Sequence, residues 1–133
     1  MSKNKVAVTE VMEQDFLVVD GLATVADALA QMIEKDLPFA FVAKRDDDDE
    51  FGILLVSDIA KKVLAPHKAP ERINVYEVMT KPVLSVQPDM DIRYCARLFD
   101  NFGISTAPVI RAGEILGVVT YGELVLKGLA SST

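Results

Sequence analysis

Hydrophobic positions recur along this chain with the period of an amphipathic helix in two separate places. Apolar side chains return every three or four residues in 25–33 and again in 92–99, so each segment has one face to bury. Thr24 precedes the first segment with Asp27 three residues on, and Asp91 precedes the second. Such residues cap helix N-termini, so the pattern predicts two equivalent helices.

Short apolar runs follow each of these helices and predict two strands and a closing helix in each half. Their β-branched and aromatic residues are typical of buried strands. The predicted strands are 39–43, 51–55, 107–110 and 116–120, and the predicted closing helices are 57–64 and 121–129. With a first strand before each amphipathic helix, the order in each half is β-α-β-β-α.

An internal repeat explains why this order occurs twice. Residues 8–19 (VTEVMEQDFLVV) and 75–86 (VYEVMTKPVLSV) align at an offset of 67 residues, with six identities in twelve columns. The offset falls to 65 by the last strand, because the first half has two more residues in the acidic loop DDDDE, a predicted surface turn. Half a chain of this size buries too little core to be stable alone. We therefore expect an α/β fold in which two β-α-β-β-α repeats pack about a pseudo-two-fold axis.

The predicted boundaries follow the repeat. The first repeat with its N-terminal lead-in covers residues 1–66, a linker covers 67–74, and the second repeat covers 75–133. The connecting stretch APHKAPER has two prolines and no hydrophobic period, which is typical of a linker.

Composition excludes several classes of function. A net charge of −6 argues against sequence-independent nucleic-acid binding, which needs a basic face. No apolar run approaches the ~20 residues of a membrane span, and the start MSKNKVAV lacks a signal-peptide core. The one cysteine, Cys95, falls on an apolar helix face and agrees with a reducing compartment. We expect a cytoplasmic protein with no membrane insertion.

The stretch GVVTYGEL, residues 117–124, has the chemistry most suited to a ligand. A strand ends at Thr120, and Thr120 with Glu123 has the spacing of a capping box, so a helix begins there. Helix N-termini present unpaired N–H groups that attract phosphate and carboxylate oxygens. In the first half Leu55 and Asp58 occupy the corresponding positions. For one such stretch alone, a helix start without a ligand is the alternative.

Together these segments resemble the CBS (cystathionine beta-synthase) domain, and two in tandem resemble a Bateman module. The resemblance rests on the Glu-Val-Met lead-in, on PDMDI after the first strand, on ISTAPV, and on the pattern G-h-h-T-x-x-D, where h is hydrophobic. It extends from residue 8 to about residue 129. The first half departs from the pattern, since Phe41 and Gly21 replace the prolines found at Pro108 and Pro88.

The resemblance implies a non-enzymatic regulatory module, an energy sensor with no required cofactor, which binds AMP, ATP, NAD or S-adenosylmethionine in clefts between its repeats. In this family the Asp of the motif binds ribose and the Thr or Ser contacts phosphate. A carboxylate suits the first role, because it can accept hydrogen bonds from both ribose hydroxyls. The candidate ligand-binding residues are Phe16, Leu17, Asp58, Thr80, Lys81, Pro82, Val83, Ile104, Ala107, Pro108, Val109, Thr120 and Glu123.

The two motif copies predict different ligand preferences. Thr120 offers a hydroxyl to a phosphate and has Thr80 and Lys81 nearby in sequence, so phosphorylated ligands should prefer its cleft. Leu55 would leave a phosphate oxygen unpaired, so the Asp58 cleft suits an unphosphorylated adenosine or a sulfonium.

We expect a homodimer, for which the apolar residues of 124–129 are candidates, and a separate regulated enzyme or transporter as the partner of a sensor. Two other interpretations are open. A ligandless structural module with degenerate motifs would serve only to dimerise. An enzyme or a metal site is disfavoured, because His67 is the only histidine and DDDDE lacks the glycine and glutamate of a calcium loop.

Overall fold

The computed structural model describes residues 5–131, which form two compact units. The N-unit consists of residues 16–83, and the C-unit combines residues 5–15 with 84–131. Each unit buries its own cluster of apolar side chains, including Val25 and Leu54 in the N-unit and Val8 and Phe99 in the C-unit. No helix of the described chain is long and apolar enough to cross a bilayer.

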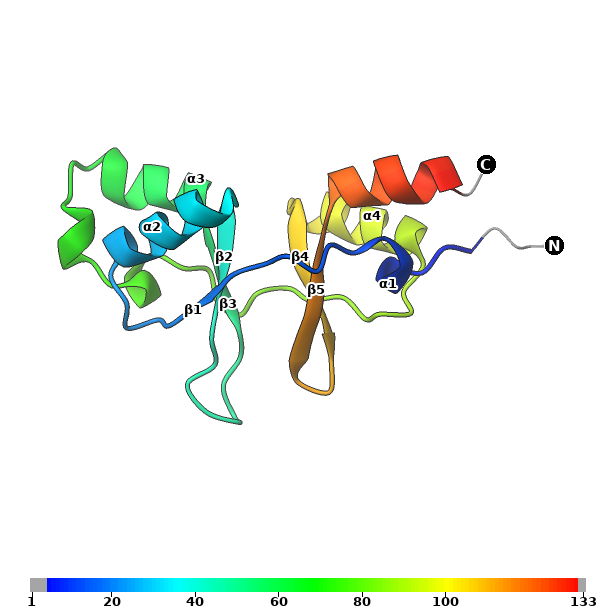
Figure 1. The fold of residues 1–133 in the computed structure, drawn as a ribbon, viewed down its shortest axis with the longest axis horizontal. Helices are drawn as coiled ribbons and strands as arrows, with labels where there is room; N and C mark the ends of the chain where they lie inside the picture. Colours follow the sequence, from blue (N-terminus) through cyan, green and yellow to red (C-terminus); the bar gives the residue numbers. More distant parts are fainter. Residues whose placement is uncertain (1–4, 132–133) are drawn as a thin grey trace. The chain divides into compact units, whose positions relative to one another are not determined.

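The N-unit contains a three-stranded sheet (Figure 1). β1 (Val18–Val19) pairs in parallel with β2 (Phe39–Val42), and β2 pairs antiparallel with β3 (Gly52–Leu55). The crossover between the parallel strands is α2 (Val25–Lys35), as the hydrophobic period predicted. The shorter helical segments are α3 (Val56–Ile59), π-helical η1 (Ala60–Leu64), and the 3-10 turns η2 (Pro70–Arg72) and η3 (Val75–Glu77).

The C-unit is built around one hairpin. β4 (Thr106–Arg111) pairs antiparallel with β5 (Glu114–Thr120), with a bulge after Val109. Its helical elements are α1 (Val8–Val11), α4 (Ile92–Phe102) and π-helical η4 (Glu123–Leu129). α2 and α4 are confirmed as the helices that the hydrophobic period predicted, and so is the mixed helix and strand class. The pseudo-two-fold packing of the repeats stays a prediction.

The predicted first strand of the second half is wrong as a strand. Val86 forms only a single parallel bridge with Val109, where the first half has the two-residue β1. Val86 donates its N–H to Pro108 and accepts from Ile110, but Pro88 follows and has no N–H to continue the pairing.

The lead-ins pack in a way that the repeat alone does not show. Residues 5–15 belong to the C-unit, where Glu13 and Val118 exchange two backbone hydrogen bonds of 2.8 Å. The second lead-in, residues 75–83, belongs to the N-unit, where Thr80 and Ile53 exchange two such bonds of 2.9 Å. Figure 1 shows α1, in blue, in the unit that contains β4 and β5. Each lead-in therefore completes the unit formed by the other repeat.

Candidate functional site

In the C-unit, Thr120 and Glu123 form the predicted helix cap. Glu123 accepts hydrogen bonds at Oε1 from the Thr120 N–H, at 2.7 Å, and from the Thr120 hydroxyl, at 2.9 Å. The same hydroxyl accepts from the N–H of Gly122 at 3.1 Å. Both side chains are half-buried. The geometry is that of a hydroxyl held against a carboxylate at the end of β5, where the helix begins.

In the N-unit, Asp58 has a hydroxyl partner from a different part of the chain. Leu55 caps α3 without a side-chain bond, as expected of an apolar residue. The hydroxyl of Thr80 donates instead to Asp58 Oδ2 at 3.2 Å. Thr80 comes from the second lead-in, so the exchange of lead-ins supplies the hydroxyl that Leu55 lacks. A hydroxyl–carboxylate pair thus follows the last strand of both units.

This placement changes the grouping that sequence proximity indicated. Thr80 and Lys81 were grouped with Thr120, but the structure places both in the N-unit, the unit of Asp58. The two neighbouring side chains have different partners. Thr80 bonds Asp58, whereas the Lys81 ammonium lies 2.6 Å from Asp49 Oδ1.

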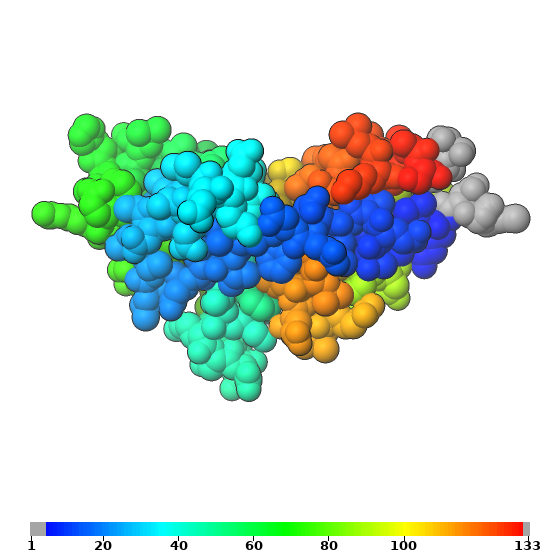
Figure 2. Space-filling model, viewed as in Figure 1, coloured from blue at the N-terminus to red at the C-terminus, as the bar shows by residue number. Residues whose placement is uncertain are grey.

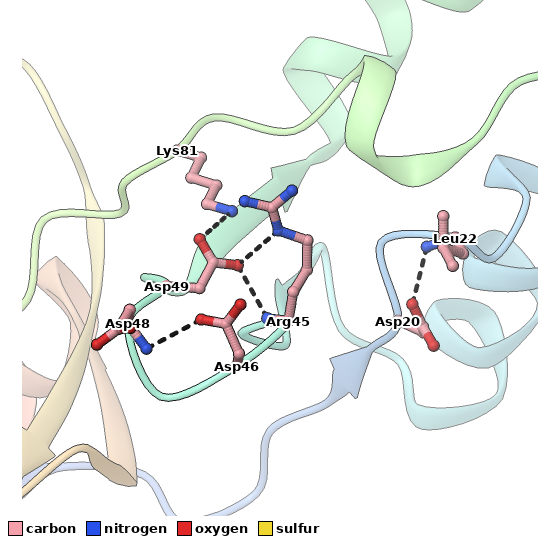
Figure 3. A network of polar contacts seen from close by, with 7 residues as sticks. All are labelled: Asp20, Leu22, Arg45, Asp46, Asp48, Asp49 and Lys81. Carbon is pink, nitrogen blue, oxygen red and sulfur yellow. Dashed lines mark hydrogen bonds and ion pairs between the residues drawn. The ribbon is translucent and has the colours of Figure 1, made fainter.

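Asp49 is the best-held carboxylate of the acidic loop (Figure 3). Its Oδ2 accepts from the backbone N–H of Arg45 at 2.8 Å and from the Arg45 Nε at 3.1 Å. Hydrogen bonds from Lys81 and Arg45 hold the pKa of Asp49 well below its usual range. The loop protrudes from the N-unit (Figure 2), yet only 7% of the Asp49 side chain is exposed. A surface turn was predicted, and this buried anchor within it was not.

The remaining N-unit candidates line the start of β1 and the end of the second lead-in. Phe16 packs edge-to-face on Phe41 at 6.0 Å between ring centroids. Leu17 is buried and accepts the Phe41 N–H at 2.8 Å. Val83 donates to the carbonyl of Phe51 at 2.9 Å, while Pro82 is exposed.

The remaining C-unit candidates are mostly inside the core. Ala107, Pro108 and Val109 lie within β4 and are buried, so their side chains shape the strand and are closed to solvent. Ile104 is half-buried and donates its N–H to Phe99 at 3.0 Å. A further cation, Arg93, is held by the cap of α4, with its Nη2 3.3 Å from Asp91.

Among residues 5–131, no group of three or more His, Cys, Asp or Glu side chains is placed so that it could hold a metal ion. Cys95 is fully buried, and this burial raises the pKa of its thiol to about 11. Such a thiol is protonated at neutral pH and unreactive while the protein is folded.

Comparison with known families agrees with the motif geometry. The CBS domain family matches residues 8–65 and 75–128, which include both hydroxyl–carboxylate pairs and both lead-ins. The chain belongs to the CBS domain family. The matched segments follow the sequence repeat, whereas the compact units exchange the lead-ins between them.

Curated relatives of this CBS chain are longer proteins. An uncharacterized protein of Methanopyrus kandleri is 26% identical over 121 residues, which is 90% of this chain and 61% of that protein. A homoserine O-acetyltransferase of Methanosalsum zhilinae is 30% identical over 91% of this chain, but the match spans 24% of that enzyme. This chain therefore resembles only one part of that enzyme, and the enzyme's name describes the longer protein.

Solved CBS structures share the fold. A hexameric CBS-CP12 protein from bloom-forming cyanobacteria is 37% identical, with a TM-score of 0.90 over 93% of this chain and 68% of that one. The CBS domain pair of protein MJ0100, in complex with 5′-methylthioadenosine and S-adenosyl-L-methionine, is 21% identical, with a TM-score of 0.78 over 92% of this chain and 98% of that one. At that identity the second likeness concerns the fold alone.

Proposed function

We propose that this CBS pair is a regulatory module that binds an adenosine-containing ligand through its two carboxylates, Asp58 and Glu123. The observation that carries the proposal is the hydroxyl–carboxylate pair that follows the last strand of each unit. A carboxylate that already accepts a protein hydroxyl has the polarity to accept ribose hydroxyls in its place. The adenosine ligands of the MJ0100 domain pair support the same ligand class.

Ligand binding at Asp58 would also reach the lead-in. A ribose that hydrogen-bonds to Asp58 would displace the hydroxyl of Thr80. The backbone of Thr80 is hydrogen-bonded to that of Ile53. Occupancy would then shift how the second lead-in sits on β3. Coupling of this kind is typically worth ~1–3 kcal/mol, enough to regulate a partner such as an enzyme or transporter.

The two carboxylates should differ in ligand preference. The Lys81 ammonium pairs with Asp49 at 2.6 Å, whereas Asp58 pairs with the Thr80 hydroxyl, so the hydrogen-bond donor at Asp58 is a hydroxyl and not an ammonium. An adenosine with no phosphate, or with a sulfonium, suits Asp58. Thr120 carries a hydroxyl at a helix start, so we assign AMP-like ligands to it, and the net charge of −6 favours AMP over triphosphates.

Thermal unfolding with added ligand tests this function. AMP, ATP, NAD and S-adenosylmethionine would be titrated into the full chain, with guanosine monophosphate as the matched control for the base. A ligand at 100 times its Kd adds about 2.7 kcal/mol to the free energy of unfolding. If none of the four raises the melting temperature, the proposal fails.

A structural dimerisation module is the second candidate. The observation that favours it is the exposed apolar face of η4, where Leu126 is 77% and Leu129 is 56% exposed. In that case Glu123 serves only as the capping partner of Thr120.

A further inference from the structure

The N-unit contains a pocket that includes neither motif carboxylate. Its volume is about 530 Å³, within the range of small-molecule sites. It opens between the ends of β1 and β2, the base of the acidic loop and the second lead-in. Its lining residues are Asp20, Gly21, Leu22, Val42, Ala43, Lys44, Arg45, Tyr76, Met79 and Lys81.

Two cationic residues of the lining, Lys81 and Arg45, already hold an oxyanion, the carboxylate of Asp49, which lies beside the lining and is not part of it. Three donors reach it: the Lys81 ammonium at 2.6 Å, the Arg45 N–H at 2.8 Å and the Arg45 Nε at 3.1 Å (Figure 3). The donors come from the second lead-in and from the loop, so they converge only in the folded unit. A phosphate or carboxylate of a ligand needs the same donors.

Part of the remaining lining suits a planar or apolar group, while Asp20 and Lys44 add charges of opposite sign. Val42 is 1% exposed and forms part of the wall, together with the half-buried Met79. Tyr76 is 52% exposed and provides an aromatic ring. Polar groups at one end and an apolar wall with an aromatic ring are the usual composition of a small-molecule site.

The repeat shows that this chemistry is particular to the N-unit. At the offset of 67, Tyr76 corresponds to Thr9 and Lys81 to Gln14, so the C-unit lacks the ring and the ammonium. The acidic loop also has two residues that the equivalent C-unit loop lacks. The core residues of the two repeats correspond, whereas these pocket residues do not.

We propose that this pocket binds a small molecule carrying an oxyanion on a planar ring, and that Asp49 occupies the oxyanion position until the ligand displaces it. Lys81 and Arg45 then pair with the ligand, and the acidic loop is released. The other four carboxylates of the loop oppose an anion, so we expect weak binding in the unmodified chain, with a Kd on the order of 1 mM. The site is independent of the adenosine proposal.

Phenyl phosphate is the probe, because it has the oxyanion and the ring but no ribose or adenine. Titration of the isotopically labelled full chain should shift the amide NMR signals of Lys44, Arg45, Tyr76 and Lys81. Benzyl alcohol, which lacks the charge, should shift them far less at equal concentration. Shifts confined to the signals of Asp58 or Thr120 would refute binding at this pocket and would not affect the adenosine proposal.

Two variants test the role of Asp49. Asp49→Asn removes the competing charge and should tighten phenyl phosphate binding about tenfold, the low end for a hydrogen bond to a charged group. Asp47→Asn, an exposed change in the same loop, is the charge-matched control and should tighten it less than twofold. Lys81→Gln should weaken binding about tenfold. Equal affinity of the Asp49 and Asp47 variants, or unchanged affinity of the Lys81 variant, would refute the proposal.

Discussion

The hydroxyl of Thr120 links a helix cap to a proposed ligand contact. It accepts from Gly122 and donates to Glu123, so its removal should affect both the helix start and ligand affinity. We predict that Thr120→Ala weakens AMP binding by about 1–3 kcal/mol, the cost of leaving a hydrogen-bonding group without its partner. Asp58→Ala should leave AMP affinity nearly unchanged, and Thr9→Ala, an exposed change on α1, is the control. A calorimetric titration that reverses the order of Thr120 and Asp58 would disprove the assignment.

Gly117, the motif glycine of the C-unit, is required by the lead-in packed on it. A Cβ there would lie 2.8 Å from both the Glu13 carbonyl and the Met12 sulfur. Gly117→Ala should therefore lower the free energy of unfolding by about 1–3 kcal/mol, the cost of overpacking. Gly21→Ala, whose Cβ would meet atoms at 3.5 Å or more, should change it far less. Urea denaturation measures both, and equal stability of the two variants would contradict this explanation.

Asp49 should make the free energy of unfolding depend on pH in the acidic range. Its pKa is lowered in the folded state, so the carboxylate stabilises the fold above its unfolded pKa of about 4, and that contribution is lost as the pH falls further. We predict that Asp49→Asn destabilises the protein at pH 7 and that the difference from the unmodified chain shrinks below pH 4. Thermal unfolding across pH measures it, with Asp47→Asn as control. A constant difference between pH 7 and pH 3 would show that Asp49 acts by packing alone.

Local hydrogen bonds at the candidate site could be predicted from the sequence, whereas long-range ones could not. The Thr120–Glu123 spacing gave the cap correctly, because a capping box is local. The Thr80–Asp58 pair joins residues 22 apart, and the Lys81–Asp49 pair joins residues 32 apart, so neither could be found from spacing. Their partners follow from how the second lead-in docks.

At the scale of elements, the C-termini of α2 and α4 differ in one informative position. Asp36 ends α2 with a φ of 55°, and its equivalent Gly103 ends α4 with a φ of 65°. The left-handed backbone conformation costs least at glycine, and a residue with a Cβ, such as aspartate, adopts it less readily. We predict that Asp36→Gly raises the free energy of unfolding by about 1 kcal/mol, and that Gly103→Ala lowers it by about the same amount.

The Gly103→Ala variant measures the backbone effect alone, since a Cβ at that position meets nothing within 4 Å. Any loss in Gly103→Ala therefore reports the backbone and not a clash. Chemical denaturation of both variants provides the measurement. A stability loss in Asp36→Gly would show that the aspartate side chain contributes more than its backbone strain costs.

Helices with a strong hydrophobic period were the most predictable elements. Residues 25–33 and 92–99 lie inside α2 and α4, because a buried stripe and a cap residue determine both ends locally. The first strand of the second half was not predictable in the same way. Val86 has the residue type of a strand, but Pro88 limits its pairing to one bridge.

At the scale of the whole molecule, the exchange of lead-ins could not be predicted from the order of the segments in the sequence. The repeat assigns residues 8–19 to the first half, yet residues up to 15 pack in the C-unit. Backbone hydrogen bonds such as those of Glu13 with Val118 carry no sequence signature, because any residue except proline can make them. A repeat therefore identifies the building block but not which copy completes it.

The surface of η4 leads to a prediction about assembly. Leu124 is 3% exposed and faces the core of the C-unit, whereas Leu126 is 77% exposed on the same helix, and Val125 is 48% exposed. One helix with a buried and an exposed apolar face is typical of an interface. We predict a homodimer at micromolar concentration, since the same face on two copies can form an isologous contact.

Leu126→Glu should dissociate this homodimer, because a carboxylate buried between two copies would have no partner. Ile33→Glu is the matched control: it places the same charge at an equally exposed position, 77%, on α2 of the N-unit, and it should leave the assembly unchanged. Sedimentation velocity of the two variants separates an effect of the η4 face from a general effect of added charge. A particle of 14.5 kDa for the unmodified chain at micromolar concentration would contradict the homodimer, and an unchanged Leu126 variant would place the interface elsewhere.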